Sequence, residues 1–179
     1  MAPKDRPVRI AAMLRPSTPR RAPARTLAVL NEIVRRYPDQ VSIHAFGGTD
    51  EELHSAGLHQ PWITNHGPLH PTRLAKLLGS CDIFVDFSDY QAMGLTLLES
   101  MASGCAAIGP VEGGATSFVQ SGVNGFLVDT ASLDECIEKT DLLVRDADLR
   151  MNLQHQAIEE SSRHLPEAAA LNILRCLFQ

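Results

Sequence analysis

Several kinds of residue and segment are scarce in this chain of 179 residues, and each scarcity excludes a class of protein. Aromatic side chains make up only 5% of the sequence, and Leu, Ala and Val carry the apolar content, which favours helices packed on a sheet over a β-sandwich. No apolar run approaches the roughly 18 residues of a membrane helix, and the start MAPKDRPVRI lacks the apolar segment of a secretory signal. We therefore expect a soluble, cytoplasmic protein.

Cysteine and net positive charge are also in short supply. The four cysteines, Cys81, Cys105, Cys136 and Cys176, are widely spaced and form no Cys-x-x-Cys pair, so we expect small buried residues in a reducing compartment rather than disulfides or a zinc site. The formal net charge of −5 argues against a nucleic-acid-binding surface. With 44% hydrophobic and 21% charged residues, the chain is also too apolar to be disordered as a whole.

The order of apolar segments predicts the fold class. Short apolar runs typical of strands lie at residues 8–14, 41–46, 62–64, 83–87, 106–108 and 126–128. Helical segments lie between and after them, at residues 27–37, 49–52, 71–78, 95–103, 117–120, 133–145, 149–162 and 166–178. Strands that alternate with helices and read as continuous apolar runs predict a parallel sheet of about six strands, covered by helices on both faces. The expected architecture is one α/β domain with a Rossmann-like, doubly wound sheet.

The loops at the carboxyl ends of the predicted strands are the expected place for a ligand. The loop RPSTPRRAP after the first strand carries Arg15, Arg20 and Arg21, and guanidinium groups can hold a polyanion such as a diphosphate through paired hydrogen bonds. A solvated, proline-rich surface turn is an equally good interpretation of this loop taken alone. Lone histidines such as His44 are more often structural than catalytic.

A second candidate site follows the fourth strand. Gly94 precedes a predicted helix that starts at Leu95 and Thr96, and the free N–H groups of a helix start favour a phosphate, which a glycine lets approach closely. Glu99 lies in the apolar stretch LTLLESMA, where we expect a buried carboxylate that needs a partner such as a ribose or an arginine. The alternative is an exposed glutamate on a polar face. The later turn with Gly113 and Gly114 is by itself typical of any loop.

The stretch CDIFVDFSDYQAMGLTLLESMASGCAAIGPVEGGATSFVQSGVNGFLV, residues 81–128, resembles the nucleotide-sugar-binding half of glycosyltransferase family 4 enzymes, which have the GT-B fold. The family pattern runs D-x-F-x-x-x-S, E-G-F-G-L-x-x-x-E-A-M-A-x-G-x-P-V, G-G-x-x-E and D-G-x-N-G-x-L-V, in the same order and spacing. RPSTPRRAP also resembles the family loop R-x-x-P-x-K-G, and the similarity extends over residues 8–153. A narrower resemblance of RPSTPRR and SDYQAMGLTLLE is to bacterial rhamnosyltransferases of surface-polysaccharide assembly.

The resemblance implies roles for particular residues. Arg15 and Arg21 take the places of the phosphate-contacting Arg and Lys, and together with Gln91 they are the expected catalytic groups. Gly94, Leu95 and Thr96 would bind the phosphates through backbone amides, and Glu99 would bind the ribose hydroxyls. In the family, the loop after the third strand contacts the nucleobase largely through its backbone, which marks Gly67 and Leu69 here.

Two positions depart from the family pattern. Gln91 stands where the family has a glutamate that contacts the donor sugar or the phosphate region, and its amide can bond a hydroxyl but brings no charge. Ser117 stands where the G-G-x-x-E motif has its glutamate. Both departures favour an alternative function, that of a degenerate, non-catalytic nucleotide-binding or interaction module. A dinucleotide oxidoreductase is disfavoured because no G-x-G-x-x-G loop follows the first strand.

The resemblance also has implications for the whole enzyme. A GT-B enzyme has two Rossmann-like domains, and all matched motifs belong to the second, so we expect residues 1–179 to be a single donor-binding domain whose N-terminal acceptor domain is absent. The expected activity is retaining transfer of a sugar from a nucleoside-diphosphate sugar to a glycan or lipid-linked acceptor, with this chain inactive alone. No cofactor is expected, and no metal, since Asp82, Asp86 and Asp89 form no Asp-x-Asp motif. Peripheral membrane association of the full-length enzyme stays open.

Overall fold

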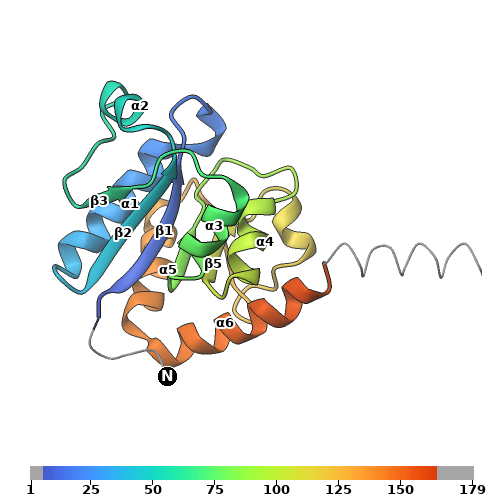
Figure 1. Ribbon diagram of the computed structural model, residues 1–179. Helices are drawn as coiled ribbons and strands as arrows, with labels where there is room; N and C mark the ends of the chain where they lie inside the picture. The colour runs from blue at the N-terminus through green and yellow to red at the C-terminus, as the bar shows by residue number, and fades with distance from the viewer. Residues whose placement is uncertain (1–5, 165–179) are drawn as a thin grey trace, which may run out of the picture.

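The computed structural model describes residues 6–164, and its centre is a parallel sheet of six strands (Figure 1). The strands are β1 (Val8–Leu14), β2 (Val41–Gly47), β3 (Ile63–Asn65), β4 (Ile83–Val85), β5 (Ala106–Pro110) and β6 (Phe126–Val128). Their order across the sheet is β3-β2-β1-β4-β5-β6, and every neighbouring pair is parallel. The chain winds outward from β1 in one direction and from β4 in the other. The predicted doubly wound architecture is therefore confirmed.

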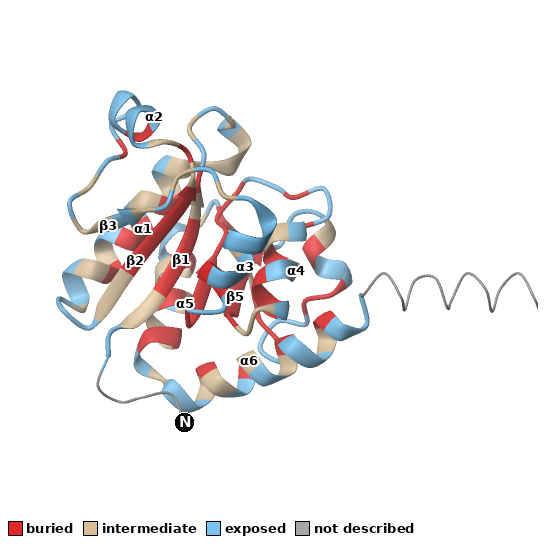
Figure 2. Ribbon diagram, in the orientation of Figure 1, coloured by how far each residue is buried: buried red, intermediate tan, exposed pale blue. Residues whose placement is uncertain are grey.

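Helices cover both faces of this sheet. The bounds are α1 (Pro23–Arg36), α2 (Asp50–Ser55), α3 (Pro71–Leu78), α4 (Leu95–Ala102), α5 (Leu133–Arg145) and α6 (Ala147–Ser162), with single 3₁₀ turns at Pro19–Arg21 and Gly114–Ser117. In one apolar core, α1 and α5 pack on one face of the strands, and in the other, α3 and α4 pack on the opposite face. Figure 2 shows the buried residues concentrated in the strands between these layers. Each face of the sheet is buried, which explains the continuous apolar runs in the sequence.

Three of the six described α-helices start with a capping side chain, α1 and α3 start with a proline instead, and α4 has neither. Thr49 forms a capping box with Glu52, the Ser132 hydroxyl accepts from the Glu135 amide, and the Asp146 carboxylate accepts from the Leu149 amide. Helix α4 is different, because its first residue follows Gly94, which has a φ of 79° and offers no capping side chain. The backbone N–H groups at the start of α4 are therefore left for another partner.

Some predicted boundaries shift in the structure. Strand β4 ends at Val85 rather than residue 87, although the Asp86 amide still donates to the Ile108 carbonyl of β5 at 2.9 Å. The short helix expected around residues 117–120 is a 3₁₀ turn at Gly114–Ser117, placed earlier by the tight packing of the glycine turn described below. The helix expected at residues 166–178 lies outside the described residues.

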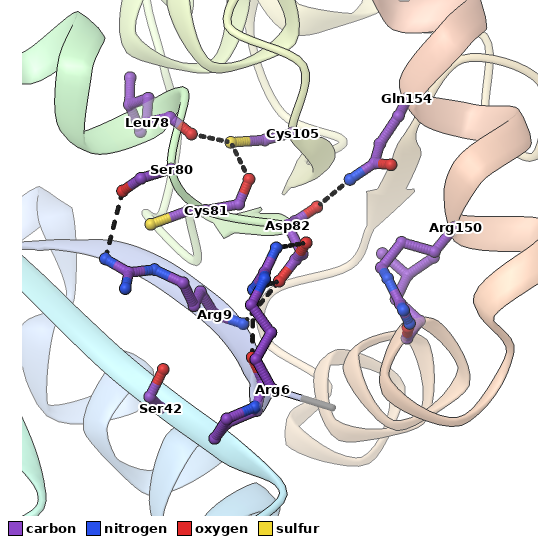
Figure 3. Close-up of polar contacts among 12 residues, drawn as sticks. Arg6, Arg9, Ser42, Leu78, Ser80, Cys81, Asp82, Cys105, Arg150 and Gln154 are labelled. Carbon is purple, nitrogen blue, oxygen red and sulfur yellow. Dashed lines mark hydrogen bonds and ion pairs between the residues drawn. The ribbon is translucent and has the colours of Figure 1, made fainter. Parts of the chain in front are cut away.

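The amino ends of the strands form a closed polar edge centred on Asp82 (Figure 3). Both carboxylate oxygens of Asp82 accept from the Arg6 guanidinium at 2.7 Å, and one also accepts from the Arg9 amide at 2.8 Å. From α6, Gln154 donates to the Asp82 carbonyl at 2.8 Å. Helix α6 runs along this edge of the sheet in Figure 1 and contributes to both cores. This edge fixes strands and helix to one another and leaves the opposite edge for the loops that carry function.

Candidate nucleotide-sugar site

The switch point of the sheet lies between β1 and β4, the adjacent strands from which the chain departs in opposite directions. In open parallel sheets, ligands bind beyond the carboxyl ends of the strands at this place. The loop with residues 15–22 follows β1, and the loop with residues 86–94 follows β4. The structure thus brings the two predicted phosphate-binding segments to one edge of the sheet.

These two loops are joined by ion pairs and by a backbone contact. The Arg21 guanidinium donates to Asp86 at 3.2 Å, and at the start of α1 the Arg25 guanidinium forms an ion pair with Asp89 at 2.9 Å. The Asp89 amide donates to the Arg20 carbonyl at 2.8 Å, and the Arg20 guanidinium lies over the ring of Tyr90. The sequence analysis treated Arg15, Arg20 and Arg21 alike as ligand-binding cations. This needs a correction, because the side chains of Arg20 and Arg21 contact the loop after β4.

Arg15 and Arg21 therefore differ in their surroundings. Arg15 is exposed, and its side chain has no hydrogen bond or ion pair within residues 6–164. Arg21 is half-buried, and burial lowers its pKa from the ordinary arginine value, with Asp86 acting in the opposite direction. Arginine stays charged in proteins even when it is buried, so both residues are cations at the mouth of the switch point.

Gln91 lies in a buried cluster with Asp86 and Ser88. Its side-chain amide donates to Asp86 at 2.8 Å and to the Ser88 hydroxyl at 2.7 Å, and only 4% of the residue is exposed. The amide N–H₂ group therefore points into the protein rather than toward a donor sugar. The sequence reasoning treated Asp86 only as one of three aspartates without a metal motif, and it missed that this carboxylate organises the loop. The available signal was a lone aspartate within the apolar run at residues 83–87.

The glycine turn after β5 packs directly on the β4–α4 loop. The Gly114 amide donates to the Gln91 carbonyl at 2.8 Å, and the Gln91 amide donates to the Glu112 carbonyl at 3.2 Å. Gly113 has a φ of 107°, and a Cβ atom there would collide with the Gln91 backbone. A Cβ atom on Gly114 would lie only 2.5 Å from the Ala92 carbonyl oxygen. The glycine pair is thus required for the approach of two loops, a role the sequence alone did not distinguish from an ordinary turn.

The start of α4 has the features expected of an anion-binding helix terminus. Gly94 is buried in a left-handed conformation, Leu95 is 58% exposed, and Thr96 is partly buried. No side chain caps this helix. The amides near Gly94, Leu95 and Thr96 and the positive end of the helix dipole are therefore available to a phosphate.

Glu99 is not where the sequence prediction put it. Glu99 is exposed rather than buried, because the apolar side of α4 turns Leu97 and Met101 into the core and leaves Glu99 on the outer side. The interpretation as an exposed glutamate is the correct one. Its carboxylate has no hydrogen-bond partner within the described residues, and partial burial by its neighbours raises its pKa. The contact between Glu99 and a ribose stays a prediction.

The loop after β3 lies against the loop after β2. Gly67 has a φ of 65°, and its carbonyl accepts from the Gly47 amide at 2.9 Å, while its own amide donates to the Asn65 side chain. Leu69 is partly buried and packs on the core under α3. These contacts fix the backbone of the segment predicted to meet the nucleobase, and the base contact itself stays a prediction.

The histidines near this loop have a structural explanation. His44 and His66 lie with their ring nitrogens 3.1 Å apart, and His44 Nε2 is 3.3 Å from the Ser42 hydroxyl. Burial, the Arg9 charge and His66 together lower the pKa of His44 to about 4. Within residues 6–164, no group of three or more His, Cys, Asp or Glu side chains could hold a metal ion. In the same range, no helix is both long and apolar enough to cross a membrane.

An all-parallel sheet with open cations and an uncapped helix at its switch point defines the class of α/β domains that bind ligands beyond their strand ends. The sequence matches the family described as Glycosyl transferases group 1 over residues 49–160. The chain belongs to this family, and the family-level resemblance is confirmed.

Similar proteins agree with this assignment. A sulfoquinovosyl transferase of Arabidopsis thaliana is 26% identical over 83% of this chain and 30% of its own length. An N,N'-diacetylbacillosaminyl-diphospho-undecaprenol alpha-1,3-N-acetylgalactosaminyltransferase of Campylobacter jejuni is 28% identical over 70% of this chain and 34% of its own length. The chain thus spans about a third of the length of these relatives.

Solved structures share the fold. The C-terminal domain of a glycosyl transferase group 1 family protein from Francisella tularensis superposes with a TM-score of 0.70 at 23% identity, over 89% of this chain and 87% of that one. An Anabaena protein solved in complex with UDP and glucose superposes with a TM-score of 0.77 at 18% identity, over 96% of this chain and 48% of that one. At these identities, the likeness establishes the fold.

Proposed function

We propose that this chain binds a nucleoside-diphosphate sugar as the donor half of a retaining glycosyltransferase that adds a sugar to a glycan or lipid-linked acceptor. The observation that carries the proposal is the convergence of the Arg15–Arg21 loop and the uncapped start of α4 at the switch point of a sheet that belongs to the group 1 family. The Anabaena protein of the same fold was solved with UDP and glucose, which supports a nucleotide-sugar donor here.

The chemistry required is stabilisation of a departing diphosphate. When the bond between the sugar carbon and the diphosphate oxygen breaks, negative charge grows on the leaving group, and preorganised cations and N–H donors lower the barrier most effectively. Arg15, Arg21 and the amides from Gly94 to Thr96 would supply that stabilisation without a metal ion. Glu99 would hold the ribose, and the backbone near Gly67 and Leu69 would meet the base.

The remaining finer assignments belong to the same proposal. Acceptor recognition would come from a preceding acceptor domain, and the isolated chain would then transfer no sugar. A rhamnosyl donor rests only on the narrower sequence resemblance. The second candidate function, a non-catalytic nucleotide-binding module, rests on Gln91 and Ser117.

Calorimetric titration with UDP, GDP, ADP, dTDP and inorganic pyrophosphate tests the proposal. We expect one nucleoside diphosphate to bind weakly but measurably, more tightly than pyrophosphate, because the chain spans only about a third of the length of its relatives. If none of the nucleotides binds at millimolar concentration, the proposal is wrong. A transfer assay after fusion to the acceptor domain of a relative then separates an enzyme from a binding module.

A further inference from the structure

The carboxylate of Asp86 is buried and fully engaged at the switch point. Only 5% of its side chain is exposed. One oxygen accepts from the Ser88 amide at 3.1 Å and from the Ser88 hydroxyl, and the other accepts from Gln91 at 2.8 Å and from Arg21 at 3.2 Å. A buried carboxylate has about four acceptor sites, and all of them are used here. The burial of the Asp86 carboxylate is therefore compensated, because each lone pair has a donor.

Arg21 depends on this carboxylate for its position. Within residues 6–164, its guanidinium makes one hydrogen-bonded ion pair, from Nη1 to Asp86. A guanidinium has five N–H donors, so one contact to Asp86 orients the group while other donors stay open to a ligand. Without the carboxylate, a half-buried cation would have no fixed direction at the mouth of the site.

The backbone of Gln91 is fixed beside Asp86. Its backbone is bonded to both Glu112 and Gly114, and a side chain on Gly113 would collide with it. The N–H₂ group of Gln91 supplies the two donors that the Asp86 and Ser88 oxygens need. A glutamate at this position would place a second carboxylate against the first, and two such groups cannot both be ionised at contact distance. This explains why position 91 carries an amide where the family pattern has a glutamate.

We propose that Asp86 is a positioning residue of the diphosphate site, which aims the Arg21 guanidinium at the ligand, and that Gln91 is the neutral donor that holds the Asp86 carboxylate in place. The inference rests on the proposed function. It assigns Gln91 to the support of the site rather than to the donor sugar.

Gln91→Glu is the central test, with UDP as the probe and affinity measured from pH 5.5 to pH 8. The ratio of variant to parent affinity is taken at each pH, so that titration of the nucleotide itself cancels. At pH 8, we expect about tenfold weaker binding, because the two carboxylates repel and release Arg21, and recovery toward the parent at pH 5.5 as they share a proton. Other charged groups around the cluster are constant between the two proteins: Arg15, Arg20, Arg21, Arg25 and Asp89.

Three further variants make the test specific. Asp86→Asn combined with Gln91→Glu exchanges the carboxylate and the amide across the same contact, and should restore affinity to within about threefold with a flat pH ratio. In an Arg21→Ala background, Gln91→Glu should change affinity by less than about twofold, because its effect acts through Arg21. Gln40→Glu adds the same charge at an exposed position at the amino edge and should behave as the parent.

The outcomes separate this inference from the proposed function. A parent that binds no nucleotide overturns both. A parent that binds UDP while Gln91→Glu binds equally well at every pH overturns only the positioning role, as does a loss that persists undiminished in the Arg21→Ala background. If Gln91→Glu unfolds at pH 8, refolding by Asp86→Asn with restored UDP binding supports the inference. A double variant that stays unfolded or fails to bind overturns it.

Discussion

Strand β4 has a buried aspartate at each end, and the two have opposite surroundings. Asp82 precedes the strand and is held by Arg6 through two bonds of 2.7 Å and by the Arg9 amide. Asp86 follows the strand and is held by Arg21 through one bond of 3.2 Å, and by Ser88 and Gln91. Both carboxylates are satisfied, but Asp82 holds Arg6 through a bidentate pair, whereas Asp86 holds Arg21 through Nη1 alone.

The same contrast extends along the two edges of the sheet. At the amino edge, Gln154 and Arg150 from α6 bond backbone carbonyls, the latter at Leu143 and Val144 (Figure 3). At the carboxyl edge, Arg15 and Glu99 are exposed without polar partners in the described chain, and α4 has no cap. Among the described residues, each edge has one buried side-chain nitrogen without a partner, Arg9 Nε at the amino edge and Arg20 Nη1 at the carboxyl edge. The two edges therefore differ in their exposed polar groups and not in their buried ones. Among the described residues, internal bonds therefore close the amino edge, whereas the carboxyl edge keeps polar groups that are accessible to a ligand.

Asp82→Ala should produce the largest loss of stability. The change leaves the Arg6 guanidinium and the Arg9 amide without their acceptor. Because the Arg6 side chain is more than a third exposed, we expect the free energy of unfolding to fall by about 1–3 kcal/mol. Urea denaturation measures the loss. UDP affinity of the folded fraction should not change.

Asp134→Ala is the matched control, because this aspartate is exposed in the first turn of α5 and should cost less than about 1 kcal/mol. Equal losses in the two variants would show that Asp82 is no anchor, and the contrast between the edges would fail.

His44 should make stability depend on pH without affecting the ligand site. Its folded pKa of about 4 lies below the ordinary value of 6.5, so the unfolded chain binds a proton that the folded chain excludes. Above about pH 6.5, His44 is neutral in both states and the free energy of unfolding is at its full value. As the pH falls from 6.5 toward 4, the free energy of unfolding decreases by up to about 3 kcal/mol. His66 acts in the same direction, because burial lowers its pKa as well.

Thermal unfolding of the parent and of His44→Gln between pH 4 and pH 7.5 measures this contribution. The variant should have a flatter profile than the parent. Superimposable profiles would mean that other groups cause the acid loss.

Arg15→Ala and Arg21→Ala should each weaken nucleoside diphosphate binding by about 1–3 kcal/mol, the scale of a charge-assisted hydrogen bond. They should differ in stability. Arg21→Ala leaves Asp86 with an unused lone pair in a buried place, whereas Arg15→Ala removes an exposed side chain that bonds nothing else within residues 6–164. Calorimetry combined with urea denaturation separates the two effects.

Arg35→Ala serves as the control, since it removes an exposed arginine that pairs only with Glu32 on α1. If Arg15→Ala and Arg21→Ala bind the nucleotide as tightly as this control does, the open groups of the carboxyl edge are not a phosphate site.

The sequence was sufficient for the fold because the signals were local. Apolar runs such as VRIAAML, residues 8–14, and glycines that end helices, such as Gly104, mark elements that the structure confirms. Order and spacing of the strands then determine a doubly wound sheet, since parallel strands need crossover helices. The predictions misplaced the carboxyl end of β4 and the 3₁₀ turn near Gly114, because the packing between loops decides both.

The site was predictable by segment but not by contact. The sequence places Arg15, Arg21 and Gln91 on the correct loops, but it gives no distance between residues that are far apart in the chain. The pairing of Arg21 with Asp86, and of Gln91 with both Asp86 and Ser88, depends on how two loops approach across the switch point. The expected burial of Glu99 failed for a related reason, since α4 has a narrow exposed side that a list of apolar neighbours conceals.

Glu99→Gln should have the smallest effect and give the most specific information. Glu99 has no partner in the described chain, and its pKa is raised by partial burial, so its ionisation costs stability as the pH rises above 4.5. The variant removes that cost and should be no less stable than the parent at pH 7. A structural carboxylate would give the opposite result, because its loss would break contacts of the folded chain.

Ligand affinity then decides what the open carboxylate is for. Gln keeps the shape and one acceptor oxygen but removes the charge that strengthens hydrogen bonds from two adjacent ribose hydroxyls, so UDP affinity should fall by about 1 kcal/mol. A 2′-deoxy nucleotide such as dTDP offers only one of those hydroxyls, and the loss there should be smaller. Calorimetry of parent and variant with UDP, dUDP and dTDP measures both losses, and dUDP separates the missing hydroxyl from the changed base. Equal losses on UDP and dUDP would exclude a ribose contact, and Glu99 would then act on the ligand only through its charge.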